Sequence, residues 1–185
     1  AAGVAAPSTA QGGLDHGIWT VLRFMYPQAD VPVLPLALVP DMAPASLFAL
    51  GEALAALRGE GVLALGTGSI THNLRLAFSA RPPRHAQRHD ADTTDSDELA
   101  ESFEFRSWFA ERSAARDWDA LFDYRRRAPH AALMHPTDEH LLPWYVAAGA
   151  GGRFAAPLRL HESVTLASLG MDSYAFGDTA AALQA

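Results

Sequence analysis

The apolar residues in the first half of the chain follow two different patterns. Between residues 44 and 61 they recur every three or four positions and stop at two glycines, which predicts a helix closed by these glycines. Residues 17–25 predict a second, shorter helix that ends before a proline. Residues 33–38 and 62–69 are apolar runs without helical spacing, so we expect two buried strands, the second leading into a glycine turn.

The second half of the chain predicts further helices and one closing strand. Residues 79–97 are polar and contain prolines, which is typical of a surface loop. Helices are expected at residues 98–115, 118–127 and 137–148, and residues 163–177 alternate well enough for a strand. Strands interleaved with helices, without an internal repeat, predict a single α/β domain with a central, mostly parallel or mixed sheet flanked by helices.

Composition and charge exclude several classes of protein. The formal net charge is −7, and the 14 basic residues form no stripe, so we expect no nucleic-acid partner. The chain has no cysteine, which excludes disulfides, thiolate metal ligands and cysteine nucleophiles. No apolar run is long enough for a membrane span, and the first residues do not resemble a signal peptide. We therefore expect no membrane partner and a cytoplasmic location.

Ionisable groups are crowded into "HPTDEHLLPW", residues 135–144. Thr137 is a suitable helix N-cap, and Asp138 and Glu139 would lie in the first turn, where the helix dipole favours acids. A cap does not explain His140, because the positive end of a helix opposes protonation of imidazole and keeps it available as a metal ligand. Two interpretations stay open: a helix cap with incidental histidines, or part of a metal site.

A second candidate is "GTGSITHNL", residues 66–74. Glycines after a strand let the backbone approach a ligand closely, and ligands bind at such strand ends in α/β sheets. The segment lacks the third glycine of a dinucleotide fingerprint and the lysine of a P-loop. His72, just beyond the turn, is either a proton-transfer group or a loop histidine with an ordinary structural partner.

A third candidate is "GGLDHGIW", residues 12–19, where Asp15 precedes His16. It is either a simple turn or an acid–histidine catalytic pair. The chain lacks the G-x-S-x-G and H-E-x-x-H motifs, which argues against a serine hydrolase and a zincin. Three histidine-bearing turns instead suggest one site at a common face. The remaining histidines are two expected to be exposed in the polar loop, His85 and His89, and three that the sequence leaves undecided, His130, His135 and His161.

Three segments together resemble the class III extradiol ring-cleavage dioxygenases, and most closely the 4,5-DOPA dioxygenase-like branch. They are "GLDHGIWTVLRFMYPQADVPVLPL", "GTGSITHNLR" and "HPTDEHLLPWYVAAGA", and they follow one another in the family's order over nearly the whole chain. The resemblance implies a non-haem Fe(II) enzyme, with Zn²⁺ possible in its place. It also implies that a catechol binds the metal through both hydroxyls and that the ring is opened with O₂.

The resemblance also implies roles for single residues. His140 matches a metal-ligand position, and Glu139 is the alternative carboxylate ligand. His72 matches a histidine that acts as acid–base catalyst and can approach the metal itself. His16 matches a histidine that lines the substrate pocket. No residue is assigned to an organic cofactor.

This chain differs from the family in one respect, because family members extend further at the amino end. That part carries the first strand and two histidine ligands. We therefore expect residues 1–185 to be the C-terminal two-thirds of one catalytic domain, which a complementary N-terminal segment or chain completes. Two other functions are considered: a non-enzymatic metal- or ligand-binding module of the same fold, and a hydrolase that uses Zn²⁺ at the same site.

Overall fold

Helices provide most of the regular structure. The computed structural model describes residues 7–9, 12–39, 41–79, 98–178 and 180–184. The α-helices are α1 (His16–Met25), α2 (Pro44–Leu54), α3 (Leu74–Ser79), α4 (Ala100–Ala115), α5 (Trp118–Phe122), α6 (Tyr124–Arg127), α7 (Ala131–Met134) and α8 (Leu142–Gly151). The 3-10 helices are η1 (Ala55–Glu60) and η3 (Ala180–Gln184), and the strands are β1 (Leu158–His161), β2 (Val164–Thr165), β3 (Leu169–Gly170) and β4 (Ser173–Ala175). In the part of the chain that is described, no helix is both long and apolar enough to cross a membrane.

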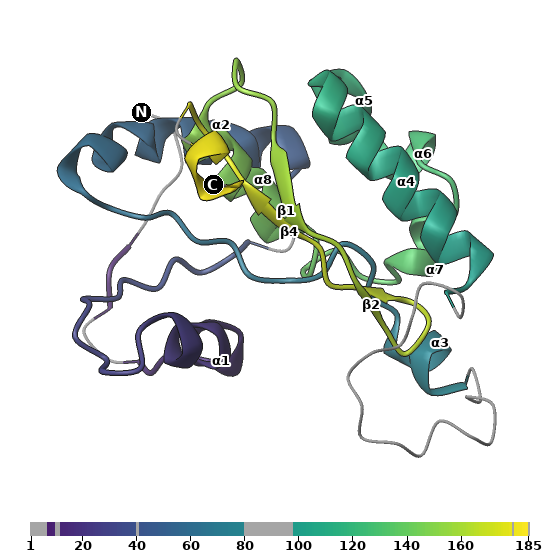
Figure 1. Ribbon diagram of the computed structural model, residues 1–185, viewed down its shortest axis with the longest axis horizontal. Helices are drawn as coiled ribbons and strands as arrows, with labels where there is room; N and C mark the ends of the chain where they lie inside the picture. Colours follow the sequence, from purple (N-terminus) through teal and green to yellow (C-terminus); the bar gives the residue numbers. More distant parts are fainter. Residues whose placement is uncertain (1–6, 10–11, 40, 80–97, 179, 185) are drawn as a thin grey trace.

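Helices α2 and α8 pack directly against each other near the middle of the molecule (Figure 1). A Cβ atom on Gly51 would lie 2.1 Å from the carbonyl oxygen of Val146, and one on Gly149 would lie 2.0 Å from that of Phe48. Only glycine at these two positions lets the backbones come this close. Helix α8 therefore continues through the "GAGG" segment to Gly151 instead of ending before it, since Gly149 serves helix packing.

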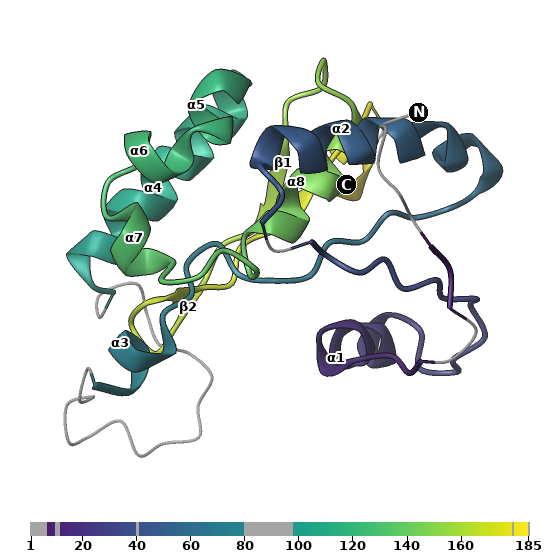
Figure 2. The ribbon, with the colours of Figure 1, turned by 180° about the vertical axis from the view of Figure 1, so that it is seen from behind.

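The core lies between this helix pair and the helices that follow the polar segment. Figure 2 shows α4 to α7 grouped at one end of the molecule and α1 at the other. The hydroxyl of Tyr145 donates a hydrogen bond of 2.7 Å to the Leu121 carbonyl, so this buried phenol is satisfied. Removal of apolar and aromatic surface from water is the main force that holds these helices together. The largest aromatic side chains with no exposed surface are Phe48, Phe105, Phe109, Tyr124 and Tyr145.

The sheets differ from the prediction. Strand β1 pairs antiparallel with β4, with Leu158 opposite Ala175, and β2 pairs antiparallel with β3, with Val164 opposite Gly170. Each sheet has two strands. The structure is thus a single unit of helices and small sheets, and the expected central parallel sheet does not occur among the described residues.

The two apolar runs expected to be strands belong to no sheet of the described residues. Residues 33–38 and 62–69 contain no strand, and no strand of the described ranges is paired with either of them. Leu34 is 94 % exposed and Leu63 is 61 % exposed. An extended apolar segment becomes a strand only where a neighbouring backbone satisfies its hydrogen bonds. The prediction of two buried strands was therefore wrong for these residues.

Several helix boundaries confirm the prediction, and others correct it. Helices α1, α2 and α4 lie where the sequence places them. The segment 118–127 is divided at Asp123 into α5 and α6, and the segment 163–177 contains three short strands instead of one. The helix expected to start at Thr137 begins only at Leu142, because Pro143 has no N–H to donate and is tolerated only in the first turn of a helix. Residues 80–97 of the expected surface loop lie outside the described residues.

Candidate functional site

His72 and His140 lie face to face. Their ring centroids are 3.5 Å apart, and the ring planes differ by only 7°. His72 precedes α3, and His140 precedes α8, so two turns from distant parts of the sequence supply the pair. The structure thus brings together two of the three histidines that the sequence singles out.

Backbone hydrogen bonds hold the two histidine-bearing segments together. The N–H of Ser69 donates to the carbonyl of His140 at 2.8 Å, and the N–H of His72 donates to the carbonyl of Met134 at 2.9 Å. The first bond uses the backbone carbonyl of His140 itself, and the second uses the backbone N–H of His72 itself. The position of each ring therefore depends on the backbone of the other segment.

His135 is a buried clamp between the same segments. Its Nε2 lies 2.7 Å from the carbonyl oxygen of Ile70, so Nε2 carries the proton and donates. Burial lowers the pKa of His135 to about 4, and the imidazole is neutral near neutral pH. Its carbonyl accepts a hydrogen bond from the Arg125 guanidinium, and the amide nitrogen of Asn73 donates to the carbonyl of Leu133 at 2.7 Å. The sequence leaves His135 undecided, and its place next to a proline gave no signal for this role.

The glycines of "GTGSITHNL" have a different purpose from the one expected. A Cβ atom on Gly68 would lie 1.9 Å from the carbonyl oxygen of His140, and one on Gly66 would lie 2.4 Å from that of Pro143. The backbone that approaches these glycines is therefore that of the second histidine segment, and no ligand is needed to explain them. The glycines let the two turns pack closely enough for the rings to stack.

His16 lies apart from this pair. It is the exposed first residue of α1, and no hydrogen bond or ring contact in the described part of the chain joins it to His72 or His140. The carboxylate of Asp15 accepts a hydrogen bond of 3.3 Å from the N–H of Ile18 and caps α1. The interpretation of Asp15 and His16 as a catalytic pair is thus not supported. A Cβ atom on Gly17 would lie 3.6 Å from the Thr67 hydroxyl, so the start of α1 borders the first histidine segment.

Glu139 supplies a carboxylate beside His140, and Thr137 holds that carboxylate. The Thr137 hydroxyl donates to the Glu139 carboxylate at 2.7 Å, so Thr137 caps no helix, contrary to the prediction. The Nδ1 atom of His140 is buried without a hydrogen bond, and Oε1 of Glu139 lies 3.5 Å from it. Burial works to raise the pKa of Glu139, but the Thr137 hydrogen bond and the nearby histidines outweigh it and lower that pKa. Glu139 is therefore a carboxylate held beside an imidazole.

The electrostatic surroundings favour a neutral His72. Burial lowers its pKa, the charge of His140 lowers it further, and Glu139 works in the opposite direction. A neutral imidazole has a lone pair that can accept a proton or bind a metal. His72 is thus suited to either chemistry.

His72, His140 and Glu139 carry donor atoms of the kind that bind metal ions. Two imidazoles and a neighbouring carboxylate are the donor types that suit iron or zinc. Within the described ranges, however, no three His, Asp or Glu side chains are grouped so that they could hold an ion. Two further histidines of the described ranges have partners elsewhere: His130 Nε2 lies 2.9 Å from Glu104, and His161 Nε2 lies 2.8 Å from the Ser163 hydroxyl. The donor types therefore suit a metal ion, but the described residues provide too few ligands to hold one.

Comparison with known proteins identifies a family and several similar proteins. The family model described as the catalytic LigB subunit of aromatic ring-opening dioxygenase matches residues 2–177. A 4,5-DOPA dioxygenase extradiol of Beta vulgaris is 34% identical over 168 residues, which cover 90% of this chain and 57% of the relative. One of Portulaca grandiflora is 33% identical over 165 residues, which cover 89% and 56%. The chain thus spans little more than half the length of these curated relatives.

The fold also has a match among solved structures. A crystal structure of an uncharacterized protein from Escherichia coli K12 superposes with a TM-score of 0.71 at 27% sequence identity, over 90% of this chain and 64% of that one. The match therefore extends over almost the same share of this chain as the sequence relatives do. With nearly the whole sequence matched by the family model, the chain belongs to the LigB family of aromatic ring-opening dioxygenases.

Proposed function

We propose that this chain takes part in the extradiol opening of a catechol-type aromatic ring with O₂ at a non-haem metal, Fe(II) or, in its place, Zn²⁺. The observation that carries the proposal is the face-to-face contact of His72 and His140 at 3.5 Å. The family supports the reaction class, since its model describes aromatic ring-opening dioxygenases. The names of the plant relatives support a substrate related to DOPA.

His140 is the proposed metal ligand. Histidine ligands commonly donate their second ring N–H to a carboxylate, which fixes the ring and its tautomer. In this proposal the Glu139 carboxylate, whose Oε1 lies 3.5 Å from Nδ1, moves closer and accepts that proton, which leaves Nε2 of His140 for the ion. Glu139 thus orients the ligand in this proposal, instead of replacing it. The further ligands lie outside the described residues, for instance in a complementary N-terminal segment.

His72 is the proposed acid–base group. Fe(II), when bound, holds catechol and O₂ together and stabilises negative charge on both. The neutral imidazole of His72 accepts a proton from a catechol hydroxyl oxygen and later returns a proton to an oxygen of the opened product. A group with a pKa below its ordinary value remains unprotonated near neutral pH, as this role requires.

His16 is the proposed contact to the substrate. The start of α1 lies next to Thr67, in the segment that leads to His72. An aromatic substrate bound in front of the stacked rings could therefore reach α1. We also propose that residues 1–185 are the larger part of one catalytic domain, because the relatives match over only part of their own length.

Ring opening is tested with His72→Phe. The chain is loaded with Fe(II) without oxygen, given DOPA and then O₂, and O₂ uptake and the yellow ring-opened product are measured. The assay is repeated with the part of the Beta vulgaris relative that this chain does not match. We expect turnover to fall by roughly 10²–10⁴-fold in His72→Phe while the metal content stays the same. His161→Phe, whose ring pairs with Ser163, is the matched control and should retain activity.

Three results would contradict the proposal. Equal loss of metal and of turnover in His72→Phe would show that His72 is mainly a ligand. Metal binding without O₂ uptake in either assay would indicate a binding module, and hydrolysis with Zn²⁺ in the absence of O₂ would indicate a hydrolase.

A further inference from the structure

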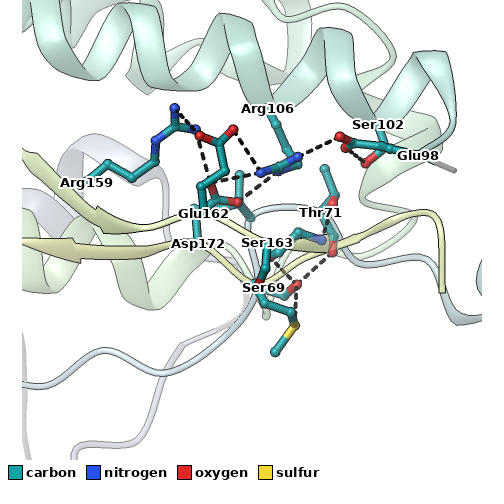
Figure 3. A network of polar contacts seen from close by, with 12 residues as sticks. Ser69, Thr71, Glu98, Ser102, Arg106, Arg159, Glu162, Ser163 and Asp172 are labelled. Atoms are coloured by element: carbon teal, nitrogen blue, oxygen red, sulfur yellow. Dashed lines mark hydrogen bonds and ion pairs between the residues drawn. The ribbon is translucent and has the colours of Figure 1, made fainter. Parts of the chain in front are cut away.

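A buried ion-pair network joins α4 to the C-terminal strands (Figure 3). The Arg106 side chain is 3 % exposed, and its partners Asp172 and Glu98 are 1 % and 4 % exposed. Arg106 donates through Nε and Nη2 to the two carboxylate oxygens of Asp172, at 2.9 and 3.1 Å, and through Nη1 to Glu98 at 2.7 Å. Ser102 donates to the other oxygen of Glu98 at 2.7 Å. The guanidinium is thus held in a fixed orientation on the inner side of α4.

The rim of the network adds a second arginine. Arg159 donates to Asp172 at 3.2 Å, and its Nη2 lies 2.7 Å from the carboxylate of Glu162. Glu162 is 46 % exposed and lies 3.3 Å from Arg106. These contacts tie β1 to the turn between β3 and β4, and they leave Arg106 and Asp172 as the buried centre.

Arg106 packs against β3, the strand that bonds to the turn before His72. A Cβ atom on Gly170 would lie 2.7 Å from Cδ of Arg106, so the arginine stem lies directly on that backbone. Gly170 also makes three hydrogen bonds to residues 69–71, which immediately precede His72. Its N–H donates to the Thr71 hydroxyl at 2.7 Å, and its carbonyl accepts from the Ile70 N–H and the Ser69 hydroxyl, each at 2.9 Å.

We propose that Arg106 is a positioning residue for His72, acting through Gly170 and Thr71. The proposal deepens the proposed function, and its predicted effect on turnover rests on that function. Its explanation of the ring geometry does not depend on that function. Thr71 immediately precedes His72 and is completely buried, and its bridge to Gly170 fixes the backbone from which the imidazole projects. A shift of Gly170 along Arg106 would therefore move the His72 ring relative to His140.

Stability alone is a weak explanation for such a network. Removing several charges from water costs more than their attraction often returns, and apolar replacements of similar shape can be as stable. The network fixes the relative positions of its members, because a planar guanidinium can donate to two carboxylates only when these lie in certain directions. Arg106 and Asp172 are 66 positions apart in the sequence, and the segment between them includes both the turn with His140 and strand β3, whose Gly170 bonds to the turn before His72. The pair thus sets where this strand lies against α4.

The test is Arg106→Lys, which keeps the charge and loses the two-pronged hydrogen bonding. Arg112→Lys, on the same helix but with its partner Asp117 partly exposed, is the matched control. The first measurement is the NMR signature of the stacked rings, namely the upfield shift of the imidazole protons and the cross-peaks between His72 and His140. The second is kcat and KM in the ring-opening assay. Circular dichroism and urea unfolding show whether each variant is folded.

We expect Arg106→Lys to remain folded, to lose the ring signature, and to lower kcat by about 10- to 100-fold with little change in KM. Arg112→Lys should behave as the unchanged chain. An intact ring signature in folded Arg106→Lys would overturn the proposal, whether or not the chain is a dioxygenase. Loss of the signature in a chain that never opens a catechol would support the positioning role and contradict the proposed function.

A second pair of variants keeps the test decisive if Arg106→Lys does not fold. Thr71→Val removes the acceptor for the Gly170 N–H at nearly constant volume, and Thr71→Ser keeps it. The ring signature should disappear in Thr71→Val and persist in Thr71→Ser. If it persists in both, Gly170 does not transmit the position of Arg106 to His72, and the proposal is wrong.

Discussion

The buried His135 should make the fold sensitive to acid. Its pKa is lowered from an ordinary 6.5 to about 4 by burial, whereas in the unfolded chain it returns to the ordinary value. Above pH 6.5 the side chain is neutral in both states, and its contribution to the pH dependence is zero. Between pH 6.5 and 4 the unfolded chain binds a proton that the folded chain does not, so the free energy of unfolding falls as the pH falls. Below pH 4 both states are protonated and the effect levels off.

The magnitude follows from the difference between the two pKa values. Each unit corresponds to about 1.4 kcal/mol, so the loss reaches about 3 kcal/mol at pH 4. Since small domains are stable by only about 5–15 kcal/mol, one histidine would remove a substantial part of the stability. Protonation leaves the Nε2–H that donates to Ile70 in place. The cost therefore comes from a charged imidazole in a buried site, where its Nδ1 atom has no hydrogen-bond partner.

The assay is urea unfolding followed by tryptophan fluorescence, at several pH values from 4 to 7.5. His135→Gln is the comparison, since its amide nitrogen can still donate to the Ile70 carbonyl but does not titrate. Wild type should lose about 3 kcal/mol more than His135→Gln between pH 7 and 4. His161→Gln, which alters an exposed histidine, should follow the wild-type curve. Parallel curves for wild type and His135→Gln would refute the reasoning, because the buried imidazole would then be titrating as it does in the unfolded chain.

Two substitutions of glycine test the close contacts that build the site and the core. Gly68→Ala should cost about 3 kcal/mol in urea unfolding, because its Cβ would lie 1.9 Å from the His140 carbonyl oxygen. Gly13→Ala has no atom within 4 Å of its Cβ and should be nearly neutral, so similar values for the two would contradict the packing of the two histidine segments. Gly51→Ala should destabilise the α2–α8 contact by about 2–3 kcal/mol. Its control is Gly59→Ala, which meets open space, and a difference below about 0.5 kcal/mol between the two would show that the helices can separate without cost.

The sequence by itself determined the helices whose signals are local. The spacing of leucines in α2, the glycine after η1 and the proline after α1 act within a few residues, so the boundaries of these elements could be predicted. The family was also accessible from sequence, because three motifs in a fixed order carry it, and the family model confirms it. The same motifs singled out His72 and His140, which the structure brings together.

Only the tertiary structure decided which backbones are neighbours. The apolar runs at 33–38 and 62–69 have the composition of strands, but a strand also needs a paired neighbour, which no local pattern can report. Gly68 likewise indicated a bound ligand from its local pattern, whereas in the structure it lies against the His140 carbonyl, a neighbour that the local pattern does not report. The use of His135 as a clamp depends on a carbonyl 65 residues away, and that of Arg106 on a carboxylate 66 residues away. Such contacts arise from the packing of distant segments, and no spacing within either segment encodes them.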